Sequence, residues 1–337
     1  MEEIQKLTNA DFKVDKPVKW CAGCGNYAIL ATVQKALPQL NVKKEDIVFI
    51  SGIGCSSRFI YYMNTYGFHT MHGRAIPIAS GLKSARPELH VWVTTGDGDA
   101  MAIGGNHFIH MIRRNIDINV LMFNNRIYGL TKGQYSPTTP FGAVTKSSPD
   151  GTIEQAFEPG ELIIGSQGTF FARAIDKDIK TMEKIIIQAA KHKGSSIVEI
   201  LQNCVIFNDA THECIVGKDV KDDRTIYLQH GEKMLFGKNK EKGLIFDGKD
   251  IKAVTIGENG ITLDDILVHD EKSQNPNVHY MLAKMAYPEL PVAIGVIRSV
   301  EKQTYEELLK NQIDNAQANT SISGIDDLLH SGKIFEV

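Results

Sequence analysis

The sequence of 337 residues lacks long hydrophobic runs and has almost no excess of one charge. Its longest largely apolar runs, such as residues 118–123, are far shorter than the roughly 18 residues that a membrane span requires. The N-terminal stretch MEEIQKLTNADFKVD is too polar for a signal peptide. The 37 basic and 40 acidic side chains leave a net charge of -3, unlike that of a typical nucleic-acid-binding protein. We therefore expect a cytoplasmic protein with no membrane or nucleic-acid partner.

Cysteine is also scarce, with five residues in the chain: Cys21, Cys24, Cys55, Cys204 and Cys214. An odd number of cysteines in a chain without an export signal argues against a disulfide framework. Metal binding or redox chemistry is the better expectation for these thiols.

Helix and strand signals alternate from about residue 20 to residue 205. Short β-branched runs predict strands at residues 47–54, 90–95, 118–123 and 196–201, and apolar residues at helical spacing predict helices near residues 26–37, 76–85, 103–114 and 182–189. The run at residues 118–123 is too apolar for a sheet with one exposed face. The alternation therefore predicts an α/β fold with a doubly wound, mostly parallel sheet.

The pattern weakens after residue 204, where charged and Gly-rich stretches separate strand candidates at residues 252–256 and 292–297 from a helix near residues 305–313. We divide the chain into an N-terminal segment (residues 1–18), a main domain (19–208) and a C-terminal accessory extension (209–337). The extension carries no chemistry that the sequence identifies.

A Gly-Asp-Gly-Asp motif at residues 96–99 directly follows a predicted buried strand, and Asn124-Asn125 ends the next one. Neighbouring parallel strands bring such loops to the same edge of a sheet, where ligands bind in these folds. Asp97, the side-chain oxygen of Asn125 and the carbonyl of Ile127 can supply the oxygen ligands that Mg²⁺ prefers. The glycines let the backbone approach a diphosphate closely.

Gly-Asp-Gly alone is a common tight turn, but followed some 25 residues later by Asn-Asn it resembles the signature of thiamine-diphosphate-dependent enzymes. The alternative of a dinucleotide site lacks support, because the third glycine of G-x-G-x-x-G is absent and the following strand does not end in a charged residue.

Four of the cysteines follow predicted turns or strands that lead to the same edge. Cys21 and Cys24 form a C-x-x-C motif, which by itself suits zinc, an iron-sulfur cluster or a redox disulfide. Cys55 follows the first strand and Cys204 the last, and four thiolates suit zinc or a cubane cluster. A cluster beside a carbanion-stabilising cofactor can remove its electrons, whereas zinc has no evident role there. Cys214 is the surplus cysteine, and we expect it to be a buried free thiol.

The assembled motifs resemble those of the β subunits of 2-oxoacid:ferredoxin oxidoreductases, and most closely the 2-oxoglutarate:ferredoxin oxidoreductases. The resemblance extends from about residue 19 to residue 208 through the segments KWCAGCGNYAIL, SGIGCSSR, HGRAIPIASGLK, TTGDGDAMAIGGNHF, FNNRIYGLTKGQYSPTTP and LQNC. It implies the fold of the thiamine-diphosphate-binding type.

The resemblance also implies site residues. The ligands of a [4Fe-4S] cluster would be Cys21, Cys24, Cys55 and Cys204, and those of Mg²⁺ would be Asp97, Asn125 and Ile127. Contacts to thiamine diphosphate would come from Ile53, Gly54, Cys55, Ser56, His72, Gly73, Gly96, Gly98, Asp99, Gly129 and Leu130.

The reaction that the resemblance implies converts a 2-oxoacid, coenzyme A and oxidised ferredoxin to acyl-CoA, CO₂ and reduced ferredoxin. The cofactor would hold the electron pair left by decarboxylation, and electrons would leave one at a time through the cluster. The glutamate that activates the cofactor is expected on the α subunit, so the active site would lie between the subunits of a heterodimer.

Arg58, three residues after Cys55, is the candidate to pair with a substrate carboxylate, against the alternative of a solvated surface arginine. For His69 and His72 we favour capping or a hydrogen bond to diphosphate or substrate over metal binding. Lys132 and Gln134 are ordinary solvated residues or part of a loop that closes over a ligand. Three alternatives compete: specificity for pyruvate or branched-chain 2-oxoacids, a zinc-stabilised binding module, and a non-oxidative decarboxylase, which would leave the cysteines unexplained.

Overall fold

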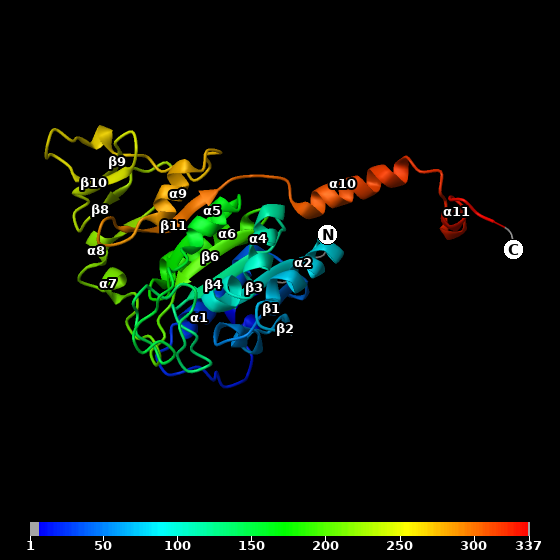
Figure 1. Ribbon diagram of the computed structural model, residues 1–337, viewed down its shortest axis with the longest axis horizontal. Coiled ribbons are helices and arrows are strands. Elements are labelled where there is room, and N and C mark those ends of the chain that lie inside the picture. The colour runs from blue at the N-terminus through cyan, green and yellow to red at the C-terminus, as the bar shows by residue number, and fades with distance from the viewer. Residues whose placement is uncertain (1–6, 336–337) are drawn as a thin grey trace.

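The computed structural model describes residues 7–335, and eight of its strands form one sheet (Figure 1). In spatial order these strands are β2 (Tyr66–His69), β1 (Ile47–Ser51), β3 (His90–Gly96), β4 (Asn119–Asn124), β6 (Ser196–Leu201), β5 (Phe170–Ile175), β11 (Val292–Ser299) and β7 (Thr225–Tyr227). All neighbouring pairs are parallel except β11 and β5, which are antiparallel. The predicted mostly parallel sheet is therefore confirmed.

The pairing register aligns the carboxyl ends of the central strands. Ser51 on β1 lies opposite Thr94 on β3, Gly96 on β3 opposite Phe123 on β4, and Asn124 on β4 opposite Leu201 on β6. Since neighbouring strands end within two residues of each other, the loops that follow them emerge at one edge of the sheet.

Helices cover both faces of the sheet. On one face, α1 (Asn26–Ala36) packs on α6 (Ile179–Lys191); on the other, α2 (Ala75–Ala85) packs on α4 (Gly105–Arg114), and α5 (Pro159–Gly165) packs on α9 (Asn277–Lys284). Buried apolar side chains from these helices and from the strands form two large clusters, one beneath each layer. Every residue of β4 and β6 is buried, as expected for a sheet covered on both sides.

Several local elements differ from the prediction. The strand expected at residues 47–54 ends at Ser51, and the helix expected from Ile103 begins at Gly105 after a separate short helix, α3 (Asp97–Met101). Strand β5 was not predicted, although its sequence FFARAI is fully buried, and neither were β2 and α5. Residues 125–158 form long loops at one end of the molecule (Figure 1).

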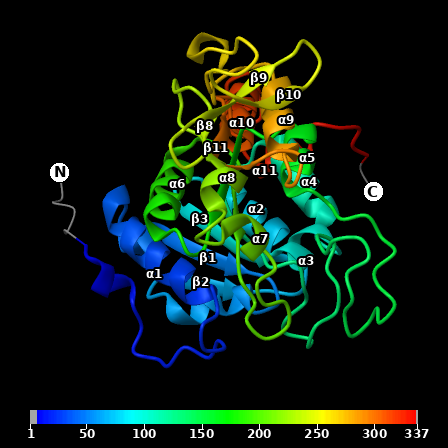
Figure 2. The ribbon, with the colours of Figure 1, turned by 90° about the vertical axis from the view of Figure 1, so that its left-hand side faces the viewer.

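The residues after 208 contribute to the main sheet as well as extending it. They supply β7 and β11, together with a small antiparallel sheet of β8 (Leu235–Phe236), β9 (Lys242–Phe246) and β10 (Ile251–Thr255) that lies beside α9 (Figures 1 and 2). Helices α10 (Tyr305–Ala318) and α11 (Ile325–Leu329) project away from the body (Figure 1). The boundary at residue 208 stays a prediction, and the sheet continues across it. Part of the N-terminal segment, residues 1–6, lies outside the described residues.

The remaining helices are short. They are α7 (Glu213–Val216), α8 (Lys221–Arg224) and the 3-10 helices Asn9–Phe12, Leu37–Leu40, Lys44–Asp46, Ser56–Tyr62 and Leu263–Asp265. Between residues 7 and 335, no helix combines the length and the apolar character needed to cross a bilayer.

Candidate active site

A cavity of about 480 Å³ opens at the carboxyl edge of the sheet, between the loops that follow β1, β3 and β4. Its walls are formed by Ile53, Gly54, Cys55, Ser56, His72, Gly96, Asp97, Gly98, Asp99, Asn125, Ile127, Tyr128, Gly129, Leu130, Thr131, Gln134 and Tyr135. The structure thus brings together the residues predicted to contact Mg²⁺ and thiamine diphosphate, apart from Gly73, which lies behind the wall.

Asp97 begins α3 and is buried at the base of the cavity. Its Oδ2 accepts hydrogen bonds of 2.5 Å from the hydroxyls of both Ser136 and Thr138. Burial raises the pKa of Asp97, while the two hydroxyl donors act in the opposite direction by stabilising the carboxylate. A bound cation would favour the ionised carboxylate further.

A buried polar network supports this carboxylate from the sheet. The Thr138 hydroxyl also donates to Oδ1 of Asn124 at 3.0 Å, and the amide of Asn124 donates to Glu199 on β6 at 2.7 Å. Burial opposes ionisation of Glu199, but Arg173, whose Nε lies 2.7 Å away, lowers the pKa of this carboxyl overall. Hence the charge on Glu199 is paired, and Asn124 and Thr138 are held in one orientation.

Asn125 presents its amide oxygen beside the backbone of Ile127. The Oδ1 atom accepts the Ile127 N–H at 3.2 Å, and the Nδ2 atom donates to Oε1 of Gln202 at 2.9 Å. An amide oxygen has two lone pairs, so this hydrogen bond leaves one for a cation. A carboxylate, an amide oxygen and a backbone carbonyl form a donor set that fits Mg²⁺.

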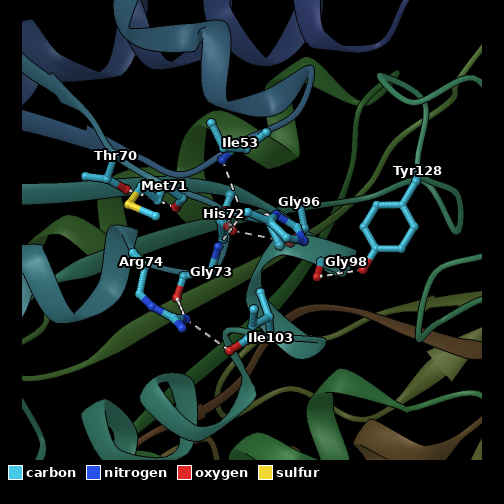
Figure 3. Close-up of polar contacts among 12 residues, drawn as sticks. Ile53, Thr70, Met71, His72, Gly73, Arg74, Gly96, Gly98, Ile103 and Tyr128 are labelled. Carbon is cyan, nitrogen blue, oxygen red and sulfur yellow. Dashed lines mark hydrogen bonds and ion pairs between the residues drawn. The ribbon is translucent and has the colours of Figure 1, made fainter.

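Asp99 joins three loops of the site. Its carboxylate accepts hydrogen bonds from the backbone N–H of Gly73 at 2.8 Å and of Ile53 at 3.2 Å, and from the Thr95 hydroxyl at 2.8 Å. The Nδ1 atom of His72 lies 2.7 Å from the same carboxylate (Figure 3). Asp99 therefore shapes the cavity by holding its loops, and it orients the ring of His72 at the cavity wall.

Gly98, which lies between the two aspartates, is required there for a steric reason. A Cβ atom on Gly98 would lie 2.2 Å from the ring of Tyr128, whose hydroxyl donates to the Gly98 carbonyl at 3.1 Å (Figure 3). Because only glycine permits this contact, the ring closes one side of the cavity directly above the start of α3.

The predicted cluster ligands gather beside this cavity. A Cβ atom on Gly129, in the cavity wall, would lie 3.5 Å from Sγ of Cys204 and 3.9 Å from Sγ of Cys55. Burial, with smaller contributions from the nearby thiols of the other three ligand candidates, raises the pKa of Cys24 to about 12. Within the described part of the chain, no three His, Cys, Asp or Glu side chains stand close enough together to hold a single metal ion.

Two hydrogen bonds to backbone carbonyls hold the cysteine loops in place. The indole of Trp20 donates to the Cys55 carbonyl at 2.7 Å, and the N–H of Gly25 donates to the carbonyl of Asn203 at 3.2 Å. Cys214 lies elsewhere, on α7, and is exposed. The prediction of a buried thiol at Cys214 was therefore wrong, because the short helix that carries it lies on the surface.

Arg58 lines a second cavity of about 520 Å³, which shares Ile53, Gly54 and Leu130 with the first. The remaining walls are Lys16, Pro17, Lys19, Tyr61, Tyr62 and His69. The Nε atom of Arg58 is buried and has no hydrogen-bond partner within residues 7–335. Because Arg58 lines the cavity, its guanidinium is placed to pair with an anionic ligand there.

Of the other sequence candidates, His69 lines the second cavity and Gln134 lines the first. Nδ1 of His69 pairs with the Ser51 hydroxyl at 3.1 Å, so His69 and His72 have different partners. Lys132 is exposed with a left-handed φ of 77°, and the side-chain amide of Gln134 donates to the Thr131 carbonyl at 2.9 Å.

Comparison with known proteins places the chain in a family. The family described as "Thiamine pyrophosphate enzyme, C-terminal TPP binding domain" matches residues 52–200. The 2-oxoglutarate oxidoreductase subunit KorB of Mycobacterium tuberculosis is 45% identical over 329 residues, which cover 97% of this chain and 87% of that protein. The chain belongs to the KorB family of 2-oxoacid oxidoreductase subunits.

A further relative and a solved structure extend this result. The 2-oxoglutarate synthase subunit KorB of Archaeoglobus fulgidus is 45% identical over 60% of this chain and 74% of its own length. The solved 2-oxoglutarate:ferredoxin oxidoreductase from Magnetococcus marinus, with 2-oxoglutarate, coenzyme A and succinyl-CoA bound, matches with a TM-score of 0.78 and 28% identity. That match covers 99% of this chain and 98% of the other. The predicted resemblance and fold are confirmed, and the chain contains a thiamine-diphosphate-binding domain.

Sequence reasoning missed three residues of this site: Ser136, Thr138 and Gln202. The first two lie in YSPTTP, which belongs to one of the segments that carry the family resemblance. An irregular loop, however, gives no periodicity from which to place a side chain. Gln202 directly follows β6, and its position at a strand end was the available signal.

Proposed function

We propose that this chain is the thiamine-diphosphate-binding β subunit of a 2-oxoglutarate:ferredoxin oxidoreductase. The reaction consumes 2-oxoglutarate, coenzyme A and two oxidised ferredoxins, and yields succinyl-CoA, CO₂, a proton and two reduced ferredoxins. One observation carries the proposal: the cavity that fits the cofactor and the group of four cysteines meet at one sheet edge, across Gly129 and Cys55.

In this proposal Asp97, Asn125 and the carbonyl of Ile127 hold Mg²⁺, which in turn binds the diphosphate. Bound thiamine diphosphate supplies a carbon nucleophile and accepts the electron pair released by decarboxylation. The protein's part is to fix the oxygen ligands, through Thr138 and Gln202, and to shape the cavity, through Asp99 and Tyr128.

Cys21, Cys24, Cys55 and Cys204 are the proposed ligands of a [4Fe-4S] cluster. Thiolates are the ligands that such clusters take, and metal binding displaces the protons that burial otherwise retains on Cys24 and Cys55. Because Cys55 also lines the cofactor cavity, an electron has a short path from the cofactor to the cluster.

The second cavity is the proposed place of the substrate's distal carboxylate. Arg58, Lys16 and Lys19 give it positive charge, and it shares the wall residues Ile53, Gly54 and Leu130 with the proposed cofactor cavity. A second carboxylate distinguishes 2-oxoglutarate from pyruvate and branched-chain 2-oxoacids, which would leave these cations unpaired. Coenzyme A is the proposed co-substrate, as in the matched Magnetococcus marinus enzyme, whose solved structure holds it.

The proposed partners are an α subunit of the same enzyme and ferredoxin. The two carboxylates in the cavity wall, Asp97 and Asp99, already accept hydrogen bonds from their own chain. We therefore expect the glutamate that activates the cofactor to come from the α subunit. The names of the relatives, which describe subunits, agree with such an assembly.

Metal analysis of the anaerobically purified αβ enzyme tests the proposal, with Cys204→Ala and Cys214→Ala as a matched pair. We expect about four irons with equal sulfide in the wild type and in Cys214→Ala, together with CoA-dependent dye reduction on 2-oxoglutarate. Cys204→Ala should lose the iron and the dye reduction together.

Stoichiometric zinc without iron would contradict the proposal and support a zinc-stabilised binding module. Loss of iron in Cys214→Ala with retention in Cys204→Ala would show that the fourth ligand was assigned to the wrong cysteine.

A further inference from the structure

Gln202 forms hydrogen bonds with both a proposed magnesium ligand and a proposed cluster ligand. Its Oε1 accepts from Nδ2 of Asn125 at 2.9 Å, and its Nε2 donates to Sγ of Cys24 at 3.5 Å. The first bond leads to the cofactor cavity and the second to the cysteine group.

The amide has a third partner, because its Nε2 also donates to the carbonyl of the adjacent Asn203. Gln202 is 1% exposed, and the backbone beside it is fixed because the N–H of Asn203 donates to Asp176 at 2.8 Å. The loop of Cys21 and Cys24 packs closely here: a Cβ atom on Gly25 would lie 3.0 Å from Cγ of Gln202. The buried side chain is therefore held by its hydrogen bonds to Asn125, Cys24 and Asn203.

The chemistry of an amide links the two contacts. Because the Asn125 amide can only donate through its nitrogen, it requires the oxygen of Gln202 on that side. The nitrogen of Gln202 must then face Cys24, where it donates a hydrogen bond to sulfur. Hydrogen bonds to cluster sulfurs are one of the means by which proteins set reduction potentials, since a donor stabilises the more negative, reduced state.

We propose that Gln202 is a positioning residue that orients the Asn125 oxygen toward Mg²⁺ and, with the same amide, raises the reduction potential of the cluster through Cys24. This inference rests on the function proposed above and adds a residue that tunes it. A change in the position of this side chain would thereby alter both the orientation of the magnesium ligand Asn125 and the reduction potential of the cluster.

Two substitutions separate the two roles. Gln202→Glu keeps an oxygen acceptor for Asn125 but replaces the nitrogen donor to Cys24, and Gln202→Met removes both contacts. Gln34→Met is the matched control, because Gln34 is a buried glutamine on α1 whose amide donates to backbone carbonyls, those of Tyr62 at 3.0 Å and Phe12 at 3.5 Å.

The readouts are the cluster midpoint potential, from a redox titration followed by electron paramagnetic resonance, and the affinity for thiamine diphosphate with Mg²⁺, from calorimetry. Both are measured on the αβ enzyme without substrate. In Gln202→Glu and Gln202→Met we expect the reduction equilibrium to shift about tenfold toward the oxidised cluster, equivalent to about 59 mV for one electron. Cofactor affinity should fall about tenfold in Gln202→Met, remain within about twofold in Gln202→Glu, and stay unchanged in Gln34→Met.

If the cluster midpoint potential of both Gln202 variants equals that of the wild type, the inference is overturned and the proposed function still stands. A wild-type enzyme with no iron-sulfur signal would overturn the proposed function, and the inference with it.

Discussion

Arg58 is the residue on which the proposed substrate specificity depends. Its buried Nε has no partner in the described chain, and Lys16 and Lys19 line the same cavity. An anionic group placed there would gain charge-assisted hydrogen bonds, which contribute about 1.5–3 kcal/mol each.

We therefore expect Arg58→Ala to lower kcat/KM for 2-oxoglutarate about 10- to 100-fold and to change the value for pyruvate much less. Arg86→Ala serves as the control, since Arg86 is an exposed arginine paired with Glu88. Steady-state kinetics with both substrates gives the comparison. An equal loss for the two 2-oxoacids would remove Arg58 from carboxylate recognition.

The sequence predicts a site residue when that residue directly follows a recognisable strand. Asp97, Asn125 and Cys55 follow strands with clear apolar patterns, so parallel pairing alone brings them to one edge. Thr138 reaches Asp97 across 41 residues from a loop with no regular structure, and no local pattern encodes that return.

The turn into α3 is the element on which the shape of the cofactor cavity depends. Gly98 sits in its first turn, and its missing side chain admits the Tyr128 ring. An added methyl group would have to displace that ring, because the added Cβ would lie within 2.2 Å of it.

Gly98→Ala should consequently weaken the affinity for thiamine diphosphate with Mg²⁺ at least about tenfold and destabilise the fold by about 1–3 kcal/mol, as overpacking does. Gly81→Ala on α2 provides the comparison, because nothing lies within 4 Å of its added Cβ and alanine favours a helix by about 0.5–1 kcal/mol. Calorimetric titration and thermal melting measure the two effects. Equal cofactor affinity in both variants would show that the ring can move without consequence.

The strands that the sequence analysis did not predict show why single elements can be missed. β5 reads FFARAI, and its central arginine interrupts an otherwise apolar run. That arginine, Arg173, is buried because Glu199 on the neighbouring β6 pairs with it at 2.7 Å. Since the partner lies 26 residues away, the sequence alone could not show that this charge belongs inside the sheet.

Across the whole molecule, the C-terminal part completes the sheet that holds the site. β11 pairs antiparallel with β5 and so covers an edge that the segment before residue 208 would leave open. A half-buried and a buried histidine lie at this junction: Nε2 of His192 is 2.9 Å from the Thr169 hydroxyl, and Nε2 of His269 donates to the Val296 carbonyl at 2.8 Å. The stability of the junction should therefore depend on pH.

Burial lowers the pKa of His192 and of His269 from 6.5 to about 4 in each case. Between pH 6.5 and pH 4 the unfolded chain therefore binds protons at these sites that the folded chain does not, so stability falls as the pH falls, by about 1.4 kcal/mol per pH unit for each group. His269→Gln keeps an N–H donor for the Val296 carbonyl but cannot be protonated. Compared with the wild type and with the exposed-site control His330→Gln, it should lose stability less steeply between pH 6.5 and pH 4 in urea unfolding. Parallel curves for all three proteins would mean that His269 is protonated in the folded state, and that its burial does not exclude the charge.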